Sequence, residues 1–488
     1  MNSSSNKTVF YAMAFTGKSH DKIVQYRQYL HSLAVKEGLN LIEQFIGVEE
    51  KELFETHGYM PLFILEKDLN LIKRADIIIA DFTDQSLGRD CEVFQAKELY
   101  GKRIISIVPN EQLKNHPYLR LFSNYIVDTP DEAFKLCHEM ALFSLSPSVV
   151  NLSREQKDMI DEKIDQMFDS NGGKNLTCLL PTELKRRWKN LFKNEYEVIL
   201  NWSFRTLPTS VRLNTQKYTQ SDFENTCRKY SWSSKLFDLS NNIYQLKSKN
   251  PTNRFDQTDE YSNGMYYIQD LASMLPPIAL GPQPGENVLD LCAAPGSKTT
   301  QIAELMKNSG NILAVDISNE RLDILNKAID RMGYLIVKPI LEDGRNIGKK
   351  YSEQFDRVLV DGPCSCEGII RYRAHKFFEW DLFQISKLTD MQFSLLESGF
   401  NALKPGGVLV YSTCTFGPEE NEGIIDLMLE KYKTASLVTM KFNGIKTRKG
   451  LTKWGHLPFD PSLSKTIRIY PQDNNTIGFF IAKIIKNN

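Results

Sequence analysis

The second half of the chain alternates between short apolar, β-branched runs and longer segments with apolar residues at helical spacing. Each apolar run ends abruptly in small or acidic residues, as a buried parallel strand does where it leaves a sheet. The predicted strands are 287–291, 311–315, 335–340, 357–360 and 408–411, the predicted helices are 299–306, 319–331 and 383–403, and a final hairpin is predicted at 466–470 and 477–484. This alternation is typical of a doubly wound α/β sheet.

A shorter alternation of the same kind opens the chain. Strands are predicted at 7–14, 76–80 and 103–108, with an amphipathic helix at 22–37. Between the two alternating regions the sequence is polar and predicts helical segments and one short strand, 210–215. We therefore predict three domains: a small α/β domain at 1–146, a helical linker and smaller subdomain at 147–259, and the main α/β domain at 260–488.

Composition narrows the class of protein. The chain has 488 residues, of which 25% are charged and 41% hydrophobic, so ordinary globular cores are expected. Lys plus Arg and Asp plus Glu both number 60, so any nucleic-acid contact must come from local basic patches. The eight cysteines lack a disulfide framework and no His/Cys set has zinc spacing, so we predict no metal site and a reducing compartment. No apolar run approaches membrane length, which predicts a cytoplasmic protein without a membrane partner.

Two of the predicted strands deliver cysteines and a carboxylate to the same edge of the sheet. Asp361 and Cys364 follow the strand 357–360, and Cys414 follows the strand 408–411. Ligands of open α/β folds bind at this edge. The three residues could form a nucleophile, a helper thiol and an acid that grips a base. Alternatively, the two cysteines are small buried hydrophobic residues, the commoner fate of such cysteines.

The loop after the first strand of the main domain indicates the kind of ligand. It contains neither a G-x-G-x-x-G motif nor a phosphate-binding P-loop, which disfavours pyrophosphate. Its small residues at 292–296 allow backbone amides to approach an adenosyl or amino-acid group closely. Asp316, at the end of the second strand, is placed to accept hydrogen bonds from ribose hydroxyls. The combination predicts S-adenosylmethionine, although each such Asp could also cap a helix.

The motifs LDLCAAPGSKT, DGPCSCEG and STCTFGPEENE resemble successive motifs of the RNA 5-methylcytosine methyltransferase family, the RsmB/Nop/NSUN group, over about residues 180–484. The resemblance implies a Rossmann-like class I methyltransferase domain with an α+β RNA-binding subdomain. It also implies that Cys414 is the nucleophile and Cys364 the second cysteine, which helps release product. The implied cofactor-binding residues are Cys292, Ala293, Ala294, Pro295, Gly296, Ser297, Lys298, Asp316 for the ribose, Asp343 for the adenine edge, and Asp361.

The chemistry of cytosine methylation explains why these residue types are needed. Addition of a thiolate to C6 makes C5 nucleophilic, and Asp361 at the N3/N4 edge would balance charge on the ring. Lys298 nearby would favour the Cys414 thiolate. The base must leave its stack, so single-stranded or flipped RNA, from tRNA or rRNA, is the predicted partner. One departure is Cys366, where the family usually has Gly or Ser. A non-catalytic RNA-binding assembly factor is the rival hypothesis.

The stretch 66–109 resembles the nucleoside 2-deoxyribosyltransferase superfamily, and most closely its deoxynucleoside 5′-monophosphate N-glycosidase branch. By that resemblance the first domain is a flavodoxin-like α/β domain that binds a nucleotide. The implied site comprises Glu92 as the glycosyl-accepting carboxylate, Ser86 and Gly88 around phosphate, and Tyr11 and Asp76 lining the pocket. Arg89 and Asp90 stand where small residues are expected. A nucleotide-sensing or docking module is therefore the alternative to a bifunctional enzyme.

A basic segment in the middle of the chain is a candidate RNA contact. Residues 183–197 interleave Lys and Arg with Trp188, Phe192 and Tyr196. Such a pattern suits phosphate neutralisation together with stacking on bases. An amphipathic helix with a solvated basic face explains it equally well.

Overall fold

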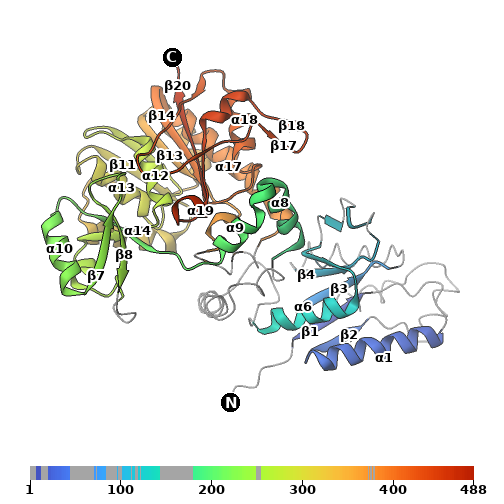
Figure 1. The fold of residues 1–488 in the computed structure, drawn as a ribbon. Coiled ribbons are helices and arrows are strands. Elements are labelled where there is room, and N and C mark those ends of the chain that lie inside the picture. The colour runs from blue at the N-terminus through green and yellow to red at the C-terminus, as the bar shows by residue number, and fades with distance from the viewer. Residues whose placement is uncertain are drawn as a thin grey trace. The chain divides into compact units, whose positions relative to one another are not determined.

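The structure is a computed structural model, shown in Figure 1. It describes residues 7–12, 20–43, 71–72, 74–83, 96, 102–110, 113–115, 119–120, 123–142, 180–248, 254–371, 373, 376 and 380–488. The chain forms two compact units, Met1–Glu197 with Arg373–Phe383, and Val198–Tyr372 with Gln384–Asn488. Among the described residues no helix combines the length and the apolar character needed to cross a bilayer.

Over its described residues, the first unit contains a five-stranded, all-parallel sheet in the order β2-β1-β3-β4-β5. The strands β1, β3 and β4 are buried, and the helices α1 and α6 contact each other. The elements are β1 (Thr8–Ala12), α1 (His20–Lys36), β2 (Asn40–Glu43), β3 (Ile77–Asp81), β4 (Arg103–Ile107), β5 (Tyr125–Val127), α6 (Pro130–Leu142) and α8 (Thr182–Phe192). The strands predicted in this region are confirmed to within a few residues.

Helix α8 packs with the first unit, although the sequence places it in the predicted middle domain. The Thr182 hydroxyl accepts from the backbone N–H of Ile126 at 2.9 Å, and Arg120 donates to the Glu183 carboxylate. Trp188 and Phe192 of α8 are buried. Their rings are therefore not free to stack on RNA bases, and the amphipathic-helix alternative for this segment is the one the structure supports.

The second unit is organised around a nine-stranded sheet, counted over the described residues, in the order β12-β11-β10-β13-β14-β20-β19-β16 with β15 beside β20. The five strands β12, β11, β10, β13 and β14 run parallel to their neighbours. The strands β20, β19, β16 and β15 join the sheet through antiparallel pairing. The strands are β10 (Asn287–Leu291), β11 (Asn311–Asp316), β12 (Val337–Leu341), β13 (Phe355–Asp361), β14 (Leu403–Thr413), β15 (Ala435–Leu437), β16 (Arg448–Lys449), β19 (Ile467–Ile469) and β20 (Phe479–Lys486). The predicted parallel sheet and the terminal hairpin are confirmed.

One strand is longer than predicted. β14 begins at Leu403, not at 408, because Leu403 already pairs with Phe355 across a register shift that accommodates Pro405 and the glycines after it. Regular pairing resumes where Arg357 meets Val408. The alternation of β-branched residues therefore marked only the regular part of the strand.

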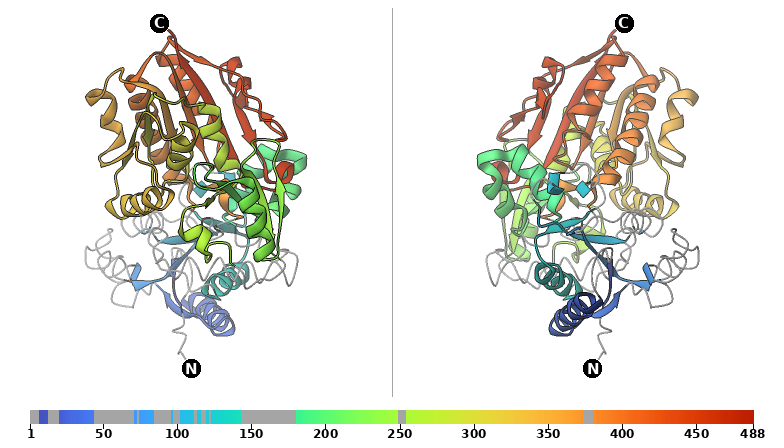
Figure 2. Two further views of the ribbon diagram at one scale, coloured as in Figure 1. Left: turned by 90° about the vertical axis from the view of Figure 1, so that its left-hand side faces the viewer. Right: turned by 90° about the vertical axis from the view of Figure 1, so that its right-hand side faces the viewer.

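Helices cover both faces of the large sheet (Figures 1 and 2). Alternate strand residues feed two separate cores: Val358, Val360 and Leu409 pack with α17, α18 and α15, whereas Leu359 and Val410 pack with α12 and α13. The helices are α12 (Leu275–Leu280), α13 (Ser297–Leu305), α14 (Asn319–Met332), α15 (Ile347–Lys350), α17 (Leu382–Ala402), α18 (Glu422–Lys431) and α19 (Pro471–Asn474). This is the doubly wound arrangement predicted from the sequence.

A smaller antiparallel sheet in the order β7-β8-β6-β9 lies beside this core in the same unit. Its elements are β6 (Thr209–Leu213), α10 (Gln220–Lys229), β7 (Trp232–Leu236), β8 (Ile243–Ser248), α11 (Asp259–Ser262) and β9 (Tyr266–Ile268), and α9 (Tyr196–Ser203) precedes it. A separate two-stranded ribbon is formed by β17 (Lys453–Trp454) and β18 (Leu457–Pro458).

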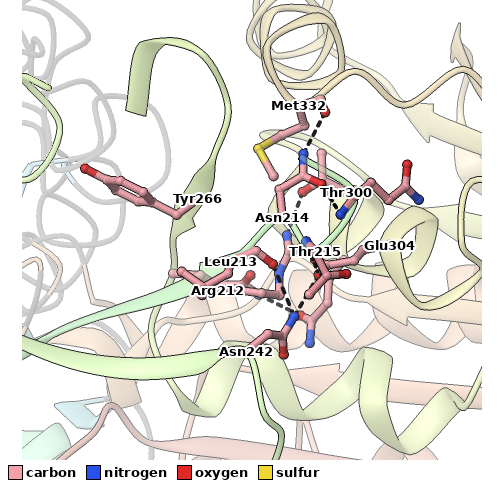
Figure 3. A network of polar contacts seen from close by, with 12 residues as sticks. Arg212, Leu213, Asn214, Thr215, Asn242, Tyr266, Thr300, Glu304 and Met332 are labelled. Atoms are coloured by element: carbon pink, nitrogen blue, oxygen red, sulfur yellow. Dashed lines mark hydrogen bonds and ion pairs between the residues drawn. The ribbon is translucent and has the colours of Figure 1, made fainter. Parts of the chain in front are cut away.

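A buried polar network joins the small sheet to the main core (Figure 3). Arg212 of β6 forms an ion pair with Glu304 of α13 and donates to the Thr300 hydroxyl at 3.1 Å. Asn242 also donates to Glu304, at 2.7 Å, and Asn214 donates to the carbonyl of Met332 in α14 at 2.8 Å. The network fixes α13, the helix that follows the loop of small residues.

Candidate active site

The loop from β10 to α13 is held by backbone contacts and by close packing. Ala293 N–H donates to the Val315 carbonyl at 2.9 Å, and Ala294 N–H donates to the Asp316 carboxylate at 3.2 Å. Gly296 has φ +103°, and a Cβ there would lie 2.7 Å from a methyl group of Leu325. A side chain at this position would force the Leu325 side chain to move and would be strained by the positive φ, so the loop favours glycine chiefly for its conformation.

The acidic residues predicted at the strand ends lie at the carboxyl edge of the sheet. Asp316 ends β11, is buried, and also accepts from Ser318 N–H at 3.1 Å, while Arg321 lies 3.4 Å from its carboxylate. Asp343 follows β12 and forms an ion pair with Arg345 at 2.6 Å, and this hydrogen bond lowers the pKa of the Asp343 carboxyl group. Asp343 also caps the 3-10 turn that follows it, accepting from Arg345 N–H at 3.0 Å, as the helix-cap alternative predicted. Asp316 does not fill that role, because the N-cap of α14 is Ser318.

Asp361 lies at the end of β13 and is the most open of these carboxylates, with 29% of its side chain exposed. Lys298 Nζ lies 2.7 Å from its Oδ2, and the Ser412 hydroxyl donates to its Oδ1 at 2.7 Å. Lys298 also lies over the ring of Phe479. The contact that the structure gives to Lys298 is therefore with Asp361, which it neutralises, whereas the sequence analysis paired this lysine with Cys414.

The two loops that bear the predicted cysteines meet at very short distances. Sγ of Cys364 lies 3.4 Å from Sγ of Cys414, and Sγ of Cys366 lies 3.9 Å from the same atom. Gly368 N–H donates to the Cys414 carbonyl, and a Cβ on Gly368 would lie 2.7 Å from that oxygen and 2.5 Å from the carbonyl of Gly478. Close backbone contact at Gly368 therefore brings the thiols together.

Both thiols are held in the neutral form. Hydrogen bonds from Cys366 and Cys414, together with burial, raise the pKa of Cys364 well above its ordinary value. For Cys414 the contact with Cys364 acts in the opposite direction, but the contact with Cys366, burial and the charge of Asp361 outweigh it and raise the pKa. A thiolate at Cys414 therefore requires a proton acceptor or a compensating positive charge.

Several buried polar residues that the sequence analysis did not single out position these loops. Glu420 accepts from Ser365 N–H at 2.8 Å and from Gln392 at 3.1 Å, and burial raises its pKa to about 7. Asn421 donates to the carbonyl of Thr415, the residue after Cys414. Both belong to the motif GPEENE. The acidic and amide residues that follow Cys414 so closely in this motif were the sequence feature from which their positioning role could have been predicted.

The edge as a whole is acidic. Burial raises the pKa of Asp290, which lies on β10 behind the loop, to about 7, and the charges of Asp361 and Asp316 contribute to the shift. Burial and the same carboxylates raise the pKa of the Cys292 thiol to about 12. A cationic ligand would relieve this accumulation of negative charge.

In the first unit, the two described members of the predicted site lie at different levels of the sheet. Asp76 precedes β3 and accepts from the backbone N–H of Thr8 at 2.7 Å, so it caps the start of the sheet. Tyr11 lies near the end of β1, where its hydroxyl and that of Tyr26 donate to Asp81 at 2.9 and 3.0 Å. Asp81, which directly follows the predicted strand 76–80, was not among the predicted site residues. The predicted residues Ser86, Gly88 and Glu92 lie outside the described residues.

Comparison with known proteins identifies relatives of this chain. Residues 277–485 match the family model described as 16S rRNA methyltransferase RsmB/F. A tRNA (cytosine(49)-C(5))-methyltransferase of Pyrococcus abyssi is 43% identical over 48% of this chain and 74% of its own length. A ribosomal RNA small subunit methyltransferase F of Serratia proteamaculans is 36% identical over 58% of each chain, so this protein spans under two thirds of that relative.

Solved structures share the fold as well as the sequence. A methyltransferase homologue from Pyrococcus horikoshii is 32% identical, with a TM-score of 0.56 over 66% of this chain and 99% of its own. The predicted Rossmann-like methyltransferase fold is thereby confirmed. The residues matched by the family model include the loop of small residues and both cysteine-bearing loops, and the chain belongs to the RsmB/F family of RNA methyltransferases.

Proposed function

We propose that this protein transfers a methyl group from S-adenosylmethionine to C5 of a cytosine in tRNA or rRNA, through a transient bond between Cys414 and C6 of the base. The observation that carries the proposal is the meeting of the Cys414 and Cys364 sulfur atoms, 3.4 Å apart, at the sheet edge that also bears Asp361. The relatives named above as cytosine-C5 and rRNA methyltransferases support the same chemistry.

The residues at the edge fit the proposed cofactor. The residues of the loop 292–296 are small, so that backbone amides can approach a ligand closely. Asp316 and Asp343 offer carboxylate acceptors for hydroxyl and amine groups, and the acidic surroundings suit a cationic sulfonium. These residues, with Ser297, Lys298 and Asp361, would hold S-adenosylmethionine. When bound, it supplies an electrophilic methyl group.

The residues of the chain perform the remaining steps. Cys414 gives its proton to a base and its sulfur adds to C6, which removes the aromaticity of the ring and makes C5 nucleophilic. Asp361 lies on the neighbouring strand, where a carboxyl group can hydrogen-bond the N3/N4 edge of cytosine and stabilise charge that develops on the ring. After methylation a base removes the C5 proton, the C6–sulfur bond breaks, and Cys414 is released.

We assign product release to Cys364. Its sulfur lies in contact with that of Cys414, and its raised pKa keeps it protonated near neutral pH. A neutral thiol at this distance can exchange a proton with the leaving thiolate of Cys414. The pair thus divides the work between a nucleophile and a proton donor, as pairs of titratable groups often do in active sites.

The test is methyl transfer from radiolabelled S-adenosylmethionine to RNA by two cysteine variants. Cys414→Ala should abolish transfer, whereas Cys364→Ala should accumulate a covalent protein–RNA adduct that resists denaturing electrophoresis. Cys227→Ala, which removes a buried thiol of α10, is the matched control. Methylation of cytosine by Cys414→Ala would show that the nucleophile is another residue. Absence of methyl transfer by the wild-type protein as well as by every variant would instead favour a non-catalytic assembly factor.

For the first unit we propose a flavodoxin-like domain that handles a nucleotide at the carboxyl edge of its sheet. The parallel strand order β2-β1-β3-β4-β5 is that of flavodoxin-like folds, which bind ligands at this edge. Asp81, Tyr11 and Tyr26 form a hydrogen-bonded group that holds this edge together. Release of free base from deoxynucleoside monophosphates, lost in Glu92→Ala, would identify a glycosidase; binding without hydrolysis would identify a sensing or docking module.

A further inference from the structure

Cys366 completes a cluster of thiols that the proposed methyl-transfer chemistry does not need. The sulfur atoms of Cys364, Cys366 and Cys414 all lie within 4.8 Å of one another, and each residue is partly accessible to solvent. Cys366 has φ +61°, a left-handed backbone conformation that is uncommon for residues other than glycine. The three sulfur atoms are close enough to contact one common ligand.

The spacing of the sulfurs matches that of zinc ligands. With Zn–S bonds of about 2.3 Å, two ligands of a tetrahedral ion are separated by about 3.8 Å. The observed separations from Cys414 are 3.4 Å to Cys364 and 3.9 Å to Cys366. The three thiols therefore need only small shifts to hold one ion, whereas a disulfide would require two sulfurs to approach to about 2.0 Å and an external oxidant to take the electrons.

We propose that Cys364, Cys366 and Cys414 form a three-thiolate site for Zn²⁺ that switches the enzyme off. Binding replaces three S–H bonds with three Zn–S bonds and releases three protons to solvent, without any change of oxidation state. The fourth position of the ion stays open to water. Sequence spacing did not reveal this site because Cys414 lies 48 residues beyond Cys366 and reaches it only through the adjacent β13 and β14.

The regulatory part of the inference rests on the proposed function. A zinc-bound Cys414 sulfur has its lone pair committed to the metal and cannot add to C6. Removal of the ion by a chelator would restore the nucleophile. Metal binding itself requires only the geometry of the three thiols, so the two parts can be tested separately.

The first experiment measures metal binding on the full-length protein, reduced and freed of metal. Zn²⁺ is titrated in competition with a chromophoric chelator, and Cd²⁺ is titrated in parallel to follow thiolate-to-metal absorption in the ultraviolet. We expect one ion per chain and release of about three protons. Cys366→Ser should weaken Zn²⁺ binding by more than about 100-fold, since even partners outside the first coordination shell are worth 10–100-fold. Cys227→Ala should bind as the wild type does.

A second measurement needs no variant and so does not depend on how Cys366→Ser folds. Alkylation followed by mass spectrometry should show that Zn²⁺ protects all three clustered cysteines. Wild-type protein that binds no stoichiometric Zn²⁺, or protection that omits Cys366, would overturn the proposed site. Equal affinity in the wild type and a folded Cys366→Ser variant would overturn it as well.

The third measurement tests the switch. Each protein is compared with itself, with chelator and with Zn²⁺, in the methyl-transfer assay. Zn²⁺ should inhibit the wild type strongly and reversibly and should inhibit Cys366→Ser only at correspondingly higher concentrations. Inhibition of equal potency in both would overturn the switch. If Cys414→Ala still transferred methyl groups, the proposed function would fail while the zinc titration would still report on the site.

Discussion

Both units of the protein place a carboxylate at the carboxyl end of a buried parallel strand, but they surround it differently. In the second unit Asp361 is partly exposed and is balanced by Lys298 at 2.7 Å. In the first unit Asp81 is buried and accepts hydrogen bonds from the hydroxyl groups of Tyr11 and Tyr26. Burial and the charge of Asp81 raise the pKa of both tyrosines, so they remain neutral donors.

The difference separates a carboxylate that can act on a ligand from one that mainly holds its surroundings together. An exposed, charge-balanced acid can exchange its partners for those of a substrate at small cost. A buried acid that neutral hydroxyls surround loses satisfied hydrogen bonds when any of them is displaced. The same position in two parallel sheets therefore predicts a site, but only the neighbouring side chains decide its chemistry.

The largest expected effect tests the support behind the methyltransferase edge. Glu304→Ala leaves Arg212 buried without its ion-pair partner, and breaking such a pair costs about 3–5 kcal/mol of unfolding free energy. Urea unfolding measures the loss, and the transition of this unit is identified as the one that added S-adenosylmethionine shifts. Glu342→Ala, which removes the partly exposed partner of the exposed Lys350, should leave the midpoint close to that of the wild type. Equal shifts in the two variants would show that the network does not brace α13.

The next prediction concerns the open carboxylate itself. Asp361→Asn keeps the shape of the side chain but removes its charge, and kcat for methyl transfer should fall about 10²–10³-fold, the usual effect of losing one group that stabilises transition-state charge. Single-turnover kinetics with radiolabelled cofactor measure the change. Glu342→Gln, which changes another partly exposed carboxylate of the same unit, should transfer methyl groups at nearly the wild-type rate. A normal kcat with a raised KM would instead assign Asp361 to binding alone.

Much of this edge could be predicted from the sequence. The apolar strands that lead to Asp361 and to Cys414 are neighbours in the sheet, so the loops that follow them were expected to lie at one edge. The structure shows that Cys364 and Cys414, which lie in these two loops, are in contact. The pairing of Lys298 with Asp361 could not be predicted, because a lysine in the first turn of α13 can reach either group and tertiary packing decides which. In the first unit Asp76 and Asp81 stand at opposite ends of one strand, and the family resemblance favoured Asp76 although the tyrosines contact Asp81.

The pH dependence of methyl transfer is a smaller expected effect, and it tests the charge state of Cys414 at the edge of the second unit. Cys366, burial and the charge of Asp361 raise the pKa of Cys414, so the thiolate is a minor species near neutral pH. As long as the pH stays below that pKa, the thiolate fraction increases about tenfold for each unit by which the pH rises. The logarithm of kcat/KM should therefore rise with pH, with a slope near one from about pH 6.5 to 8.5. A flat profile over this range would show that Cys414 is ionised in the free enzyme or that another step limits the rate.

The smallest expected effect tests the neutral side of the comparison. Tyr11→Phe removes one hydroxyl donor from Asp81, while Tyr26 and the backbone N–H of Thr83 still donate to it. The loss should be about 1 kcal/mol in local stability, the typical net value of one hydrogen bond. Hydrogen exchange of peptides from β1 and β3 measures it within the first unit, and methyl transfer should be unaffected. A loss several times larger would mean that Asp81 depends on Tyr11 as strongly as Arg212 depends on Glu304. The contrast between an edge supported by a buried ion pair and an edge held together by several hydroxyl groups would then disappear.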